Sequence, residues 1–254
     1  MFLLEIKGLS KHFGGIRAIE EISFSVQDGA ILSIIGPNGA GKTTLFNCLT
    51  GFIRPTRGGI TLQQKNITGI SADRISRLGI SRTFQNIRLF REMTVIENIM
   101  VAQHARIRSG LLAAVLRLPG FKKEEMEVRQ KSFEYLELLR LETLAGKTAG
   151  SLAYGIQRKI EIARALATGA DVLLLDEPTA GMNPQETDDM MLTIKNLQKL
   201  GKTILLIEHD MKVVMGISDR IIVLDHGVKI AEGPPHEIKS DPMVIEAYLG
   251  KEIQ

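Results

Sequence analysis

The sequence predicts an α/β fold built on a parallel sheet. Continuous apolar runs of strand length occur at Val172–Leu175, Ile204–Ile207 and Ile221–Leu224, and helical patterns separate them. This alternation is typical of βα units whose strands run parallel. A further apolar run, Ala30–Ile35, ends at Gly36 and fits a strand buried on both faces. The chain of 254 residues is long enough for one large domain that carries a subdomain.

Shorter β patterns surround the apolar run at residues 30–35. Leu3–Leu9 and Ile19–Val26 alternate in part, and each precedes a break that contains glycine. Gly59–Thr68 fits a short hairpin, and Thr44–Leu49 fits a helix that Gly51 ends. We therefore expect an N-terminal antiparallel β subdomain beside the α/β core.

From about Gln85 to Leu166 the pattern changes to long helices with charged faces. Within Lys122–Leu141, four apolar residues are expected to share one helix face: Met126, Phe133, Leu136 and Leu139. We interpret residues 85–166 as an inserted helical subdomain. Residues 1–84 and 167–254 then form the α/β core with its β subdomain, and residues 1–254 form a single domain.

The C-terminal third contains several sequence signals for helix ends and turns. A helix is expected between the strands at 172–175 and 204–207, with Asn183 as N-cap, Pro184 at the first position and Glu186 at the third. Gly201 can end it. His226-Gly227 lies between two β-like runs and predicts a closing hairpin.

Composition excludes several classes of protein. Lys and Arg total 32 and Asp and Glu total 29, a net charge of +3 without the basic stripe that binds nucleic acid. No apolar run approaches the roughly 18 residues of a membrane span. Glu5 places a charge too early for a signal peptide, so we expect none. Cys48 is the single cysteine, which excludes an internal disulfide and fits core packing in a reducing compartment.

A glycine-rich motif follows the buried strand at residues 30–35. It matches G-x-x-x-x-G-K-[ST] and consists of Gly36, Pro37, Asn38, Gly39, Ala40, Gly41, Lys42 and Thr43, with Thr44 next. Glycines let successive backbone N–H groups turn inward around an anion, and the following helix adds the positive end of its dipole. Lys42 would reach the β- and γ-phosphates, and the Thr43 hydroxyl would ligate Mg²⁺. The motif therefore predicts a nucleotide-binding P-loop.

Two acids and a histidine follow neighbouring C-terminal strands. Asp176 and Glu177 come directly after Val172–Leu175, at the edge where open α/β sheets bind ligands. Asp176 is suited to hold Mg²⁺ through water, and Glu177 to polarise an attacking water. His209 follows the next strand and is a candidate γ-phosphate sensor. Two other interpretations stay open: Glu177 could cap a turn, and His209 could be an ordinary residue at a strand end.

In order and spacing, these motifs resemble the nucleotide-binding subunit of an ABC transporter along essentially the whole chain. Gln85 matches the family's Q-loop, Ala180–Asn183 stands where the D-loop lies, and Phe13 matches the aromatic residue that stacks on adenine. The resemblance implies a P-loop NTPase core of the ABC ATPase type. On the residues alone, Phe13 could instead belong to the core and Gln85 to an exposed loop.

The signature motif of that family departs from its commonest form. Many ABC proteins have L-S-G-G-Q-Q-R where this chain has Leu152, Ala153, Tyr154, Gly155, Ile156, Gln157 and Arg158. In the family this loop contacts the γ-phosphate bound to the opposite subunit, which implies a role in trans for Ala153, Tyr154 and Gly155. Backbone N–H groups and the helix dipole survive the substitutions. Ala153 lacks the serine hydroxyl, however, and a helix start without a ligand stays an alternative.

An Ala-Tyr-Gly signature is characteristic of one branch, the ATPases of importers for branched-chain amino acids. Arg82–Asn98, Val101–His104 and Ile207–Met211 also resemble that branch, as does the helical material around Ala105–Arg129. Ile156 departs from it, because the branch usually has glutamine there. Importers of urea or short amides stay open as alternatives.

The resemblance implies roles, cofactors and partners. ATP and Mg²⁺ are the expected cofactors, with Thr43, Gln85 and Asp176 at the metal. The catalytic residues would be Glu177, His209, Gln85 and Lys42. The chain would form a homodimer, or a heterodimer with a paralogous ATPase, on the cytoplasmic side of the inner membrane. It would bind two integral membrane permease subunits there and act indirectly with a periplasmic or extracellular solute-binding protein.

Two other classes of protein fit the sequence less well. An ABC ATPase that acts on nucleic acid or ribosomes usually has two cassettes or a coiled-coil insertion, and neither is visible. A P-loop kinase or GTPase has no use for a signature loop before the Asp-Glu strand. We therefore expect an ATP hydrolase coupled to transport, without a nucleic-acid partner.

Overall fold

The computed structural model describes residues 2–103 and 119–249, and the chain divides into two compact units. We call residues 1–82 with 171–254 the sheet unit and residues 83–170 the helical unit. The sequence pattern placed these boundaries at 84/85 and 166/167. Much of the helical material expected around Ala105–Arg129 lies outside the described residues.

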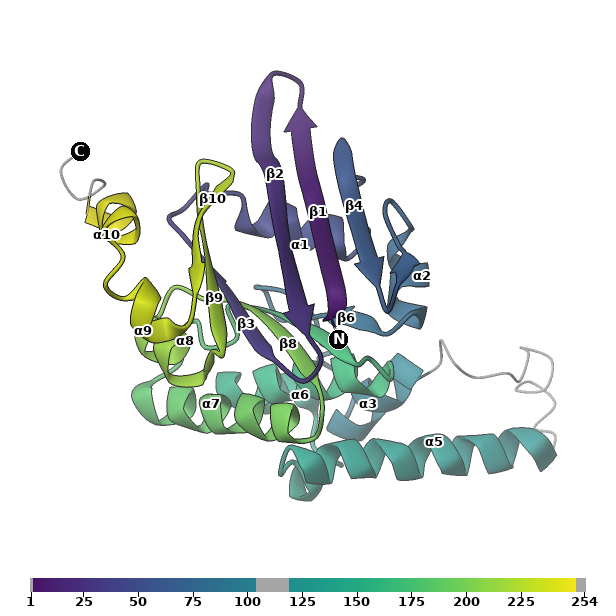
Figure 1. Ribbon diagram of the computed structural model, residues 1–254. Coiled ribbons are helices and arrows are strands. Elements are labelled where there is room, and N and C mark those ends of the chain that lie inside the picture. Colours follow the sequence, from purple (N-terminus) through teal and green to yellow (C-terminus); the bar gives the residue numbers. More distant parts are fainter. Residues whose placement is uncertain (1, 104–118, 250–254) are drawn as a thin grey trace. The chain divides into compact units, whose positions relative to one another are not determined.

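The sheet unit contains a six-stranded sheet in the order β10-β9-β3-β8-β7-β6 (Figure 1). Its strands are β3 (Ile31–Ile35), β6 (Ile80–Arg82), β7 (Val172–Asp176), β8 (Thr203–Ile207), β9 (Arg220–Asp225) and β10 (Val228–Gly233). Neighbours pair in parallel except β9 and β10. Every residue of β3, β7 and β8 is buried, which explains their nearly continuous apolar sequences. The predicted α/β class is confirmed.

A four-stranded antiparallel sheet forms the expected N-terminal β subdomain. Its order is β2-β1-β4-β5, with β1 (Phe2–Phe13), β2 (Ile16–Gln27), β4 (Arg57–Leu62) and β5 (Lys65–Asn66). Both long strands extend beyond their predicted ends, because pairing continues to Phe13 and Ile16 on either side of a Gly-Gly turn. One apolar core joins this sheet to β3 and to α1 (Lys42–Leu49), with Leu4, Ile34 and Phe46 among its members.

Short elements escaped sequence analysis, among them α2 (Ala72–Arg77), β6 and the C-terminal helices α9 (Pro235–Ile238) and α10 (Pro242–Leu249). Helix α2 has six residues, too few to show a helical period. Strand β6 has three residues, two of them polar, and joins the sheet edge by pairing Arg82 with Leu174 of β7. Helix α2 and strand β6 depend on tertiary contacts more than on local pattern.

The signals read in the C-terminal third are confirmed. Helix α7 (Pro184–Lys199) begins with a capping box, in which the Asn183 side chain accepts from the Glu186 N–H at 3.0 Å and Glu186 accepts from the Asn183 N–H at 3.1 Å. His226 and Gly227 have φ of 44° and 82° at the hairpin turn between β9 and β10. The remaining helices are α8 (Met211–Ile217), α9 (Pro235–Ile238) and α10 (Pro242–Leu249).

The helical unit contains α3 (Val95–Gln103), α5 (Pro119–Leu138) and α6 (Tyr154–Ala167), with 3₁₀ turns at Glu142–Leu144 and Ala149–Ser151. Helix α3 contacts both α5 and α6, and α5 contacts α6. Most residues of α6 after its first turn are buried.

The apolar face predicted for α5 is wrong in part. Leu136 and Leu139 are buried and Phe133 is half-buried, but Met126 is 65% exposed. The buried side runs instead through Val128 and Ser132, because Gln103 of α3 donates to the Val128 carbonyl at 3.0 Å and to the Ser132 hydroxyl at 2.7 Å. A buried polar contact of this kind cannot be read from apolar spacing.

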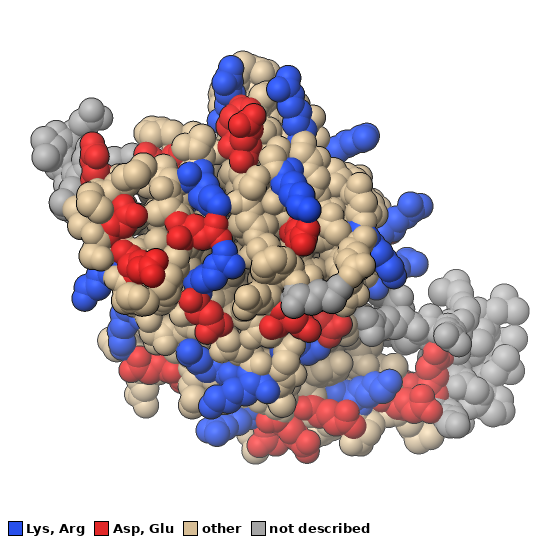
Figure 2. Space-filling view, viewed as in Figure 1, with Lys and Arg blue, Asp and Glu red and all other residues tan. Residues whose placement is uncertain are grey.

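No membrane span is found among the described residues, and the face shown in Figure 2 has no broad basic patch. No helix within residues 2–103 and 119–249 has the length and apolar character to cross a bilayer. On the face that Figure 2 shows, Lys and Arg side chains are interspersed with Asp and Glu side chains. That face lacks the basic surface typical of proteins that bind nucleic acid.

Candidate active site

The P-loop connects the end of β3 to the start of α1, and two of its glycines have no substitute. Gly36 has φ 146°, and a Cβ there would lie 2.0 Å from the Leu224 carbonyl oxygen. Gly41 has φ 100°, and its Cβ would lie 2.5 Å from the Ala18 carbonyl oxygen. Neighbouring backbone therefore sets the path of the loop, and only glycine fits these two positions.

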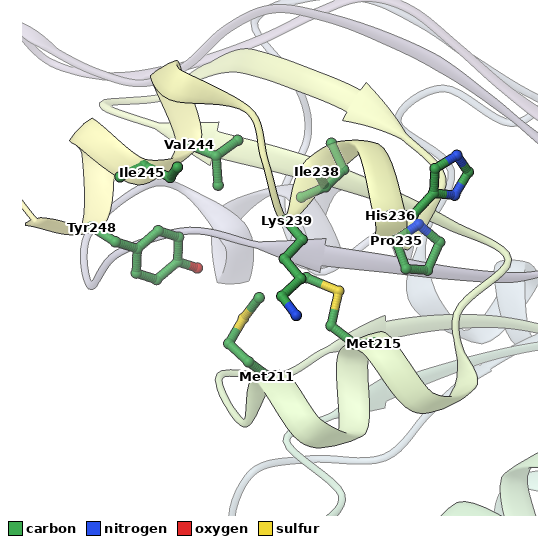
Figure 3. Close-up of a pocket in the computed structure, with 9 residues that line it drawn as sticks. All are labelled: Met211, Met215, Pro235, His236, Ile238, Lys239, Val244, Ile245 and Tyr248. Atoms are coloured by element: carbon green, nitrogen blue, oxygen red, sulfur yellow. The ribbon is translucent and has the colours of Figure 1, made fainter.

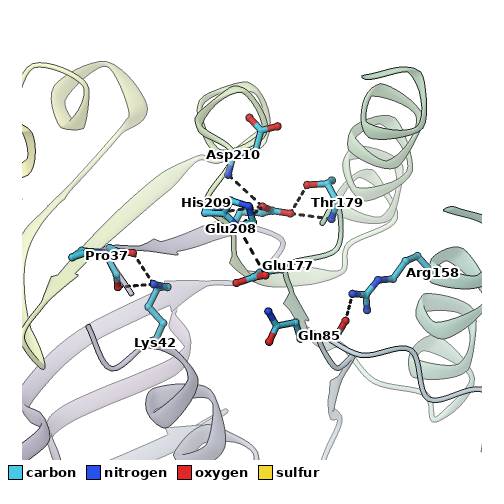
Figure 4. Close-up of polar contacts among 10 residues, drawn as sticks. Pro37, Lys42, Gln85, Arg158, Glu177, Thr179, Glu208, His209 and Asp210 are labelled. Carbon is cyan, nitrogen blue, oxygen red and sulfur yellow. Dashed lines mark hydrogen bonds and ion pairs between the residues drawn. The ribbon is translucent and has the colours of Figure 1, made fainter. Parts of the chain in front are cut away.

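The polar groups of the P-loop gather at its centre and at the start of α1. Lys42 Nζ donates to the Gly36 carbonyl at 2.6 Å and to the Pro37 carbonyl at 2.9 Å, which holds the ammonium across the loop (Figure 4). Asn38, Gly39 and Thr43 are exposed. The loop thus presents a cation, a hydroxyl and the N-terminus of an eight-residue helix, a set suited to polyphosphate.

Asp176 lies at the end of β7 in a buried ion pair. Its Oδ2 is 2.6 Å from Arg82 Nη2, and both side chains are less than a tenth exposed. Arg82 also donates to Asn47 Oδ1 of α1 at 2.6 Å and lies over the Phe46 ring, 5.5 Å from its centroid. The sequence did not predict a role for Arg82 or Asn47 at the site, because an arginine on a short edge strand is expected to be exposed to solvent. The arginine ties the Asp176 carboxylate to the helix that follows the P-loop.

Glu177 and His209 face each other at the ends of β7 and β8. Glu177 has φ 47°, an unusual conformation for a side chain of its type, and its N–H donates to the Ile207 carbonyl at 2.9 Å. Its Oε2 lies 3.9 Å from His209 Nδ1, and the His209 side chain is 67% exposed. The structure therefore brings together a partly buried carboxylate and an accessible imidazole at the edge where the P-loop also lies.

The oxygen donors of this edge fit a hard cation such as Mg²⁺. Within the described ranges, 2–103 and 119–249, no cluster of three or more His, Cys, Asp or Glu residues could hold a metal by itself. The Thr43 hydroxyl and the Asp176 carboxylate are the donor types that Mg²⁺ takes when nucleotide phosphates and waters complete its shell.

The surroundings of Phe13 and Cys48 bear on two expectations from the sequence. Phe13, at the end of β1, is 46% exposed with Lys11 Nζ 4.9 Å from its ring centroid, so it is not a core residue. An exposed ring beside a cation can stack on a planar base. Cys48 is buried, and desolvation raises its pKa to about 11, which fits packing and not nucleophilic chemistry.

In the helical unit, Gln85 belongs to a segment held by α6. Arg158, 2% exposed, donates to the backbone carbonyl of Gln85 (Figure 4). It also donates to the Phe84 carbonyl and pairs with Glu161 at 3.0 Å. Glu161 in turn accepts from the Arg88 N–H at 2.8 Å. These contacts leave the Gln85 backbone attached to the helix that carries the signature motif.

The signature residues lie at the start of α6. Ala153 is the N-cap and provides no side-chain hydrogen bond, while Ala153 and Tyr154 are exposed and Gly155 is buried. Gln157 donates back to the Leu152 carbonyl at 2.7 Å. The 14-residue helix therefore has an exposed N-terminus without a capping hydroxyl, as the Ala153 substitution implies.

A separate cavity of about 590 Å³ lies in the sheet unit between α8, α9 and α10 (Figure 3). Its walls are mainly apolar, with Met211, Met215, Val244, Ile245 and Tyr248 among them. Burial raises the pKa of Tyr248 above its ordinary value. The cavity contains none of the P-loop, acid or histidine positions predicted from the sequence, and its lining does not suit a polyphosphate.

Comparison with known proteins places this geometry in a family. The family model described as ABC transporter matches residues 19–180. The chain belongs to the ABC transporter family. A second model, branched-chain amino acid ATP-binding cassette transporter, matches residues 228–253. The resemblance inferred from the motifs is confirmed, and the chain is an ATP-binding cassette with the ATPase activity of that family.

Similar proteins cover the chain nearly end to end. It is 49% identical over 252 residues to the high-affinity branched-chain amino acid transport ATP-binding protein LivG of Salmonella typhimurium, covering 98% of both chains. A solved ATP-binding cassette of an ABC transporter in its ADP conformation is 36% identical, with a TM-score of 0.86, covering 98% of this chain and 99% of that one. A dimeric cassette bound to ADP and Pi in a post-hydrolysis state is 26% identical, with a TM-score of 0.75 and coverages of 91% and 98%.

Proposed function

We propose that this chain is the ATPase subunit of an importer for branched-chain amino acids. The main support for branched-chain amino acids as the substrate class is the 49% identity to LivG over 98% of both chains. The family model for branched-chain amino acid cassettes, which matches residues 228–253, supports the same class. The Ala-Tyr-Gly signature at the start of α6 supports the same branch.

We propose two composite ATP sites in a head-to-tail dimer. Each site takes the P-loop (36–44), Phe13, Asp176, Glu177 and His209 from one chain, with Gln85 from its helical unit. The exposed α6 N-terminus at Ala153, Tyr154 and Gly155 comes from the other chain. A dimeric relative with ADP and Pi supports a dimer of this kind. The partner is a second copy or a paralogous ATPase.

The chemistry is hydrolysis of ATP by positioning and charge stabilisation. Lys42 and the loop N–H groups hold the phosphates, Phe13 stacks on the base, and Glu177 orients and polarises the attacking water. His209, 3.9 Å from Glu177, contacts the γ-phosphate. Thr43, Asp176 and Gln85 would hold Mg²⁺, which would offset the charge of the phosphates.

The partners follow from the transport role. Two integral membrane permeases bind the chain at the cytoplasmic side of the inner membrane, where the chain is peripheral. A solute-binding protein outside the membrane delivers the amino acid, and no nucleic acid takes part. The interspersed charges on the face in Figure 2 are compatible with this assignment.

Uptake in reconstituted vesicles tests the proposal. The chain is expressed with two permeases, a paralogous ATPase and the solute-binding protein of a branched-chain amino acid importer, and the assembly is placed in liposomes loaded with Mg-ATP. Labelled leucine, isoleucine and valine should enter, and labelled urea and acetamide should not. Vesicles with the Glu177→Gln chain are the matched control and should show no uptake. Entry of urea or acetamide alone would move the assignment to a neighbouring branch.

A further inference from the structure

Glu208, at the end of β8, is a buried acid to which neither the motifs nor the comparisons give a role. Its side chain is 0% exposed, although it stands directly before the exposed His209. Its Oε1 accepts from the Thr179 N–H at 2.9 Å and from the Thr179 hydroxyl. Its Oε2 accepts from the His209 N–H at 3.1 Å and from the Asp210 N–H at 3.5 Å (Figure 4). Each oxygen therefore binds a different loop.

We infer that Glu208 is a positioning residue for ATP hydrolysis: it joins the loop that carries Glu177 to the loop that carries His209. The inference rests on the roles proposed above for Glu177 and His209. Burying a carboxylate is costly unless donors surround it, and here both loops supply donors to it. A neutral amide at this position has one acceptor oxygen, so it cannot accept from both loops.

The backbone at Glu177 explains why such a link is needed. Its φ of 47° is unfavourable for a residue with a Cβ and persists only where the surroundings hold it. On one side, the Glu177 N–H is bound to Ile207, the residue before Glu208. Two residues further on, Thr179 is bound to Glu208 itself. The Glu177 segment is therefore attached to the end of β8 at two points, which fixes the direction of its carboxylate toward His209.

A matched pair of carboxylate-to-amide variants tests the inference on the full-length chain. Glu208→Gln breaks the link between the loops. Asp219→Asn is the control, because Asp219 accepts from the Ile31 N–H at 2.8 Å and from Gln198 Nε2 at 2.6 Å near the opposite ends of β3 and β9. For each variant, kcat and KM for Mg-ATP and the thermal midpoint are measured. Glu208→Gln should lower kcat by about 10- to 100-fold while KM stays within about twofold, because a small misplacement of reacting groups costs rate before it costs binding. Asp219→Asn should leave kcat unchanged.

Thr179→Val keeps the experiment decisive if Glu208→Gln fails to fold. It removes only the hydroxyl and retains the backbone N–H bond, so a smaller fall in kcat at constant KM is expected. The double variant should lose no more than Glu208→Gln alone, because both changes break one link. An unchanged kcat in Glu208→Gln or, where that variant does not fold, in Thr179→Val would overturn the inference. So would an equal loss in Asp219→Asn. A wild-type chain without ATPase activity, both alone and together with a paralogous ATPase, would instead refute the proposed function.

Discussion

Both units of this chain bury charged side chains, but they differ in where the residues of their motifs lie. In the sheet unit, apolar strands β3, β7 and β8 are wholly buried, and the polar groups stand at their ends, where Lys42, Glu177 and His209 lie. In the helical unit, charged side chains are themselves buried along α6, with Arg158 and Glu161 both 5% exposed or less. Exposed side chains at the strand ends can be substituted without disturbing the apolar core. The buried charges of α6, in contrast, contribute both to stability and to the position of the Gln85 backbone.

In the sheet unit, turnover and folding should therefore depend largely on different residues. The P-loop path is set by backbone approaches at Gly36 and Gly41, and the strands are held by apolar contacts. The exposed or partly exposed side chains at the strand ends, Glu177 and His209, should therefore affect turnover far more than folding. In the helical unit, Arg158 holds the backbone of Gln85, so a single substitution should affect folding first.

The largest effect is expected for Glu177→Gln in the sheet unit. The amide keeps the size of the carboxylate but cannot polarise water as a base, so kcat should fall by about 100-fold or more. ATP binding should persist, because Glu177 is not among the P-loop groups, and the ATP-bound dimer should accumulate. Steady-state hydrolysis, equilibrium binding of ATP and sedimentation with ATP measure these three properties. Near-normal hydrolysis would remove Glu177 from its role.

Arg158→Met in the helical unit should lower the free energy of unfolding by about 3–5 kcal/mol, because it removes the ion-pair partner of the buried Glu161 carboxylate. Burial already holds the pKa of Glu161 above its ordinary value, and Arg158 acts against that shift. A carboxyl whose folded pKa exceeds its unfolded pKa loses stability as pH rises between the two values. Without Arg158 the folded pKa rises further, so the defect should be larger at pH 8 than at pH 5.

Denaturant unfolding at those two pH values measures the effect. Arg158→Met with Glu161→Leu is the matched control, because it removes both charges and should recover part of the loss. A defect of the same size at both pH values would mean that Arg158 acts through the Phe84 and Gln85 carbonyls and not through Glu161.

The contrast between the units also explains what the sequence could predict. The strands of the larger sheet other than β6, together with the capping box of α7, follow local rules of burial and hydrogen bonding, and they were predicted closely. The α5 face was misplaced because Gln103 and Ser132 form a buried polar contact that apolar spacing does not encode.

Within the site, the loops that match motifs could be predicted from the sequence, but the residues that hold these loops in place could not. Arg82, Asn47 and Glu208 are polar residues whose local sequence suggests exposure, yet each is bound to a residue distant in the chain. Only the tertiary pairing of β6 with β7 and the neighbouring ends of β7 and β8 bring these groups to their partners.

A moderate effect is expected for His209→Ala. The side chain is 67% exposed, so folding should change by less than about 0.5 kcal/mol. Loss of a group that contacts the γ-phosphate should lower kcat by about tenfold and ATP affinity by much less. Hydrolysis and binding assays separate the two. An equal loss in both would indicate a structural histidine, and His209→Gln is the control that retains a hydrogen-bonding side chain.

Ala153→Ser should have the smallest effect. It tests both the stability of α6 and the contact of its N-terminus with the nucleotide. Serine at the N-cap of α6 should stabilise the helix by about 0.5–1 kcal/mol. If the same hydroxyl also contacts phosphate in the opposite chain, ATP-driven dimerisation should rise about two- to threefold. Ala153→Asp separates these effects, because aspartate caps the helix equally well but repels an anion. It should raise the thermal midpoint while weakening dimerisation. Stronger dimerisation in the aspartate variant would show that this helix end acts through its own stability and not through contact with the nucleotide.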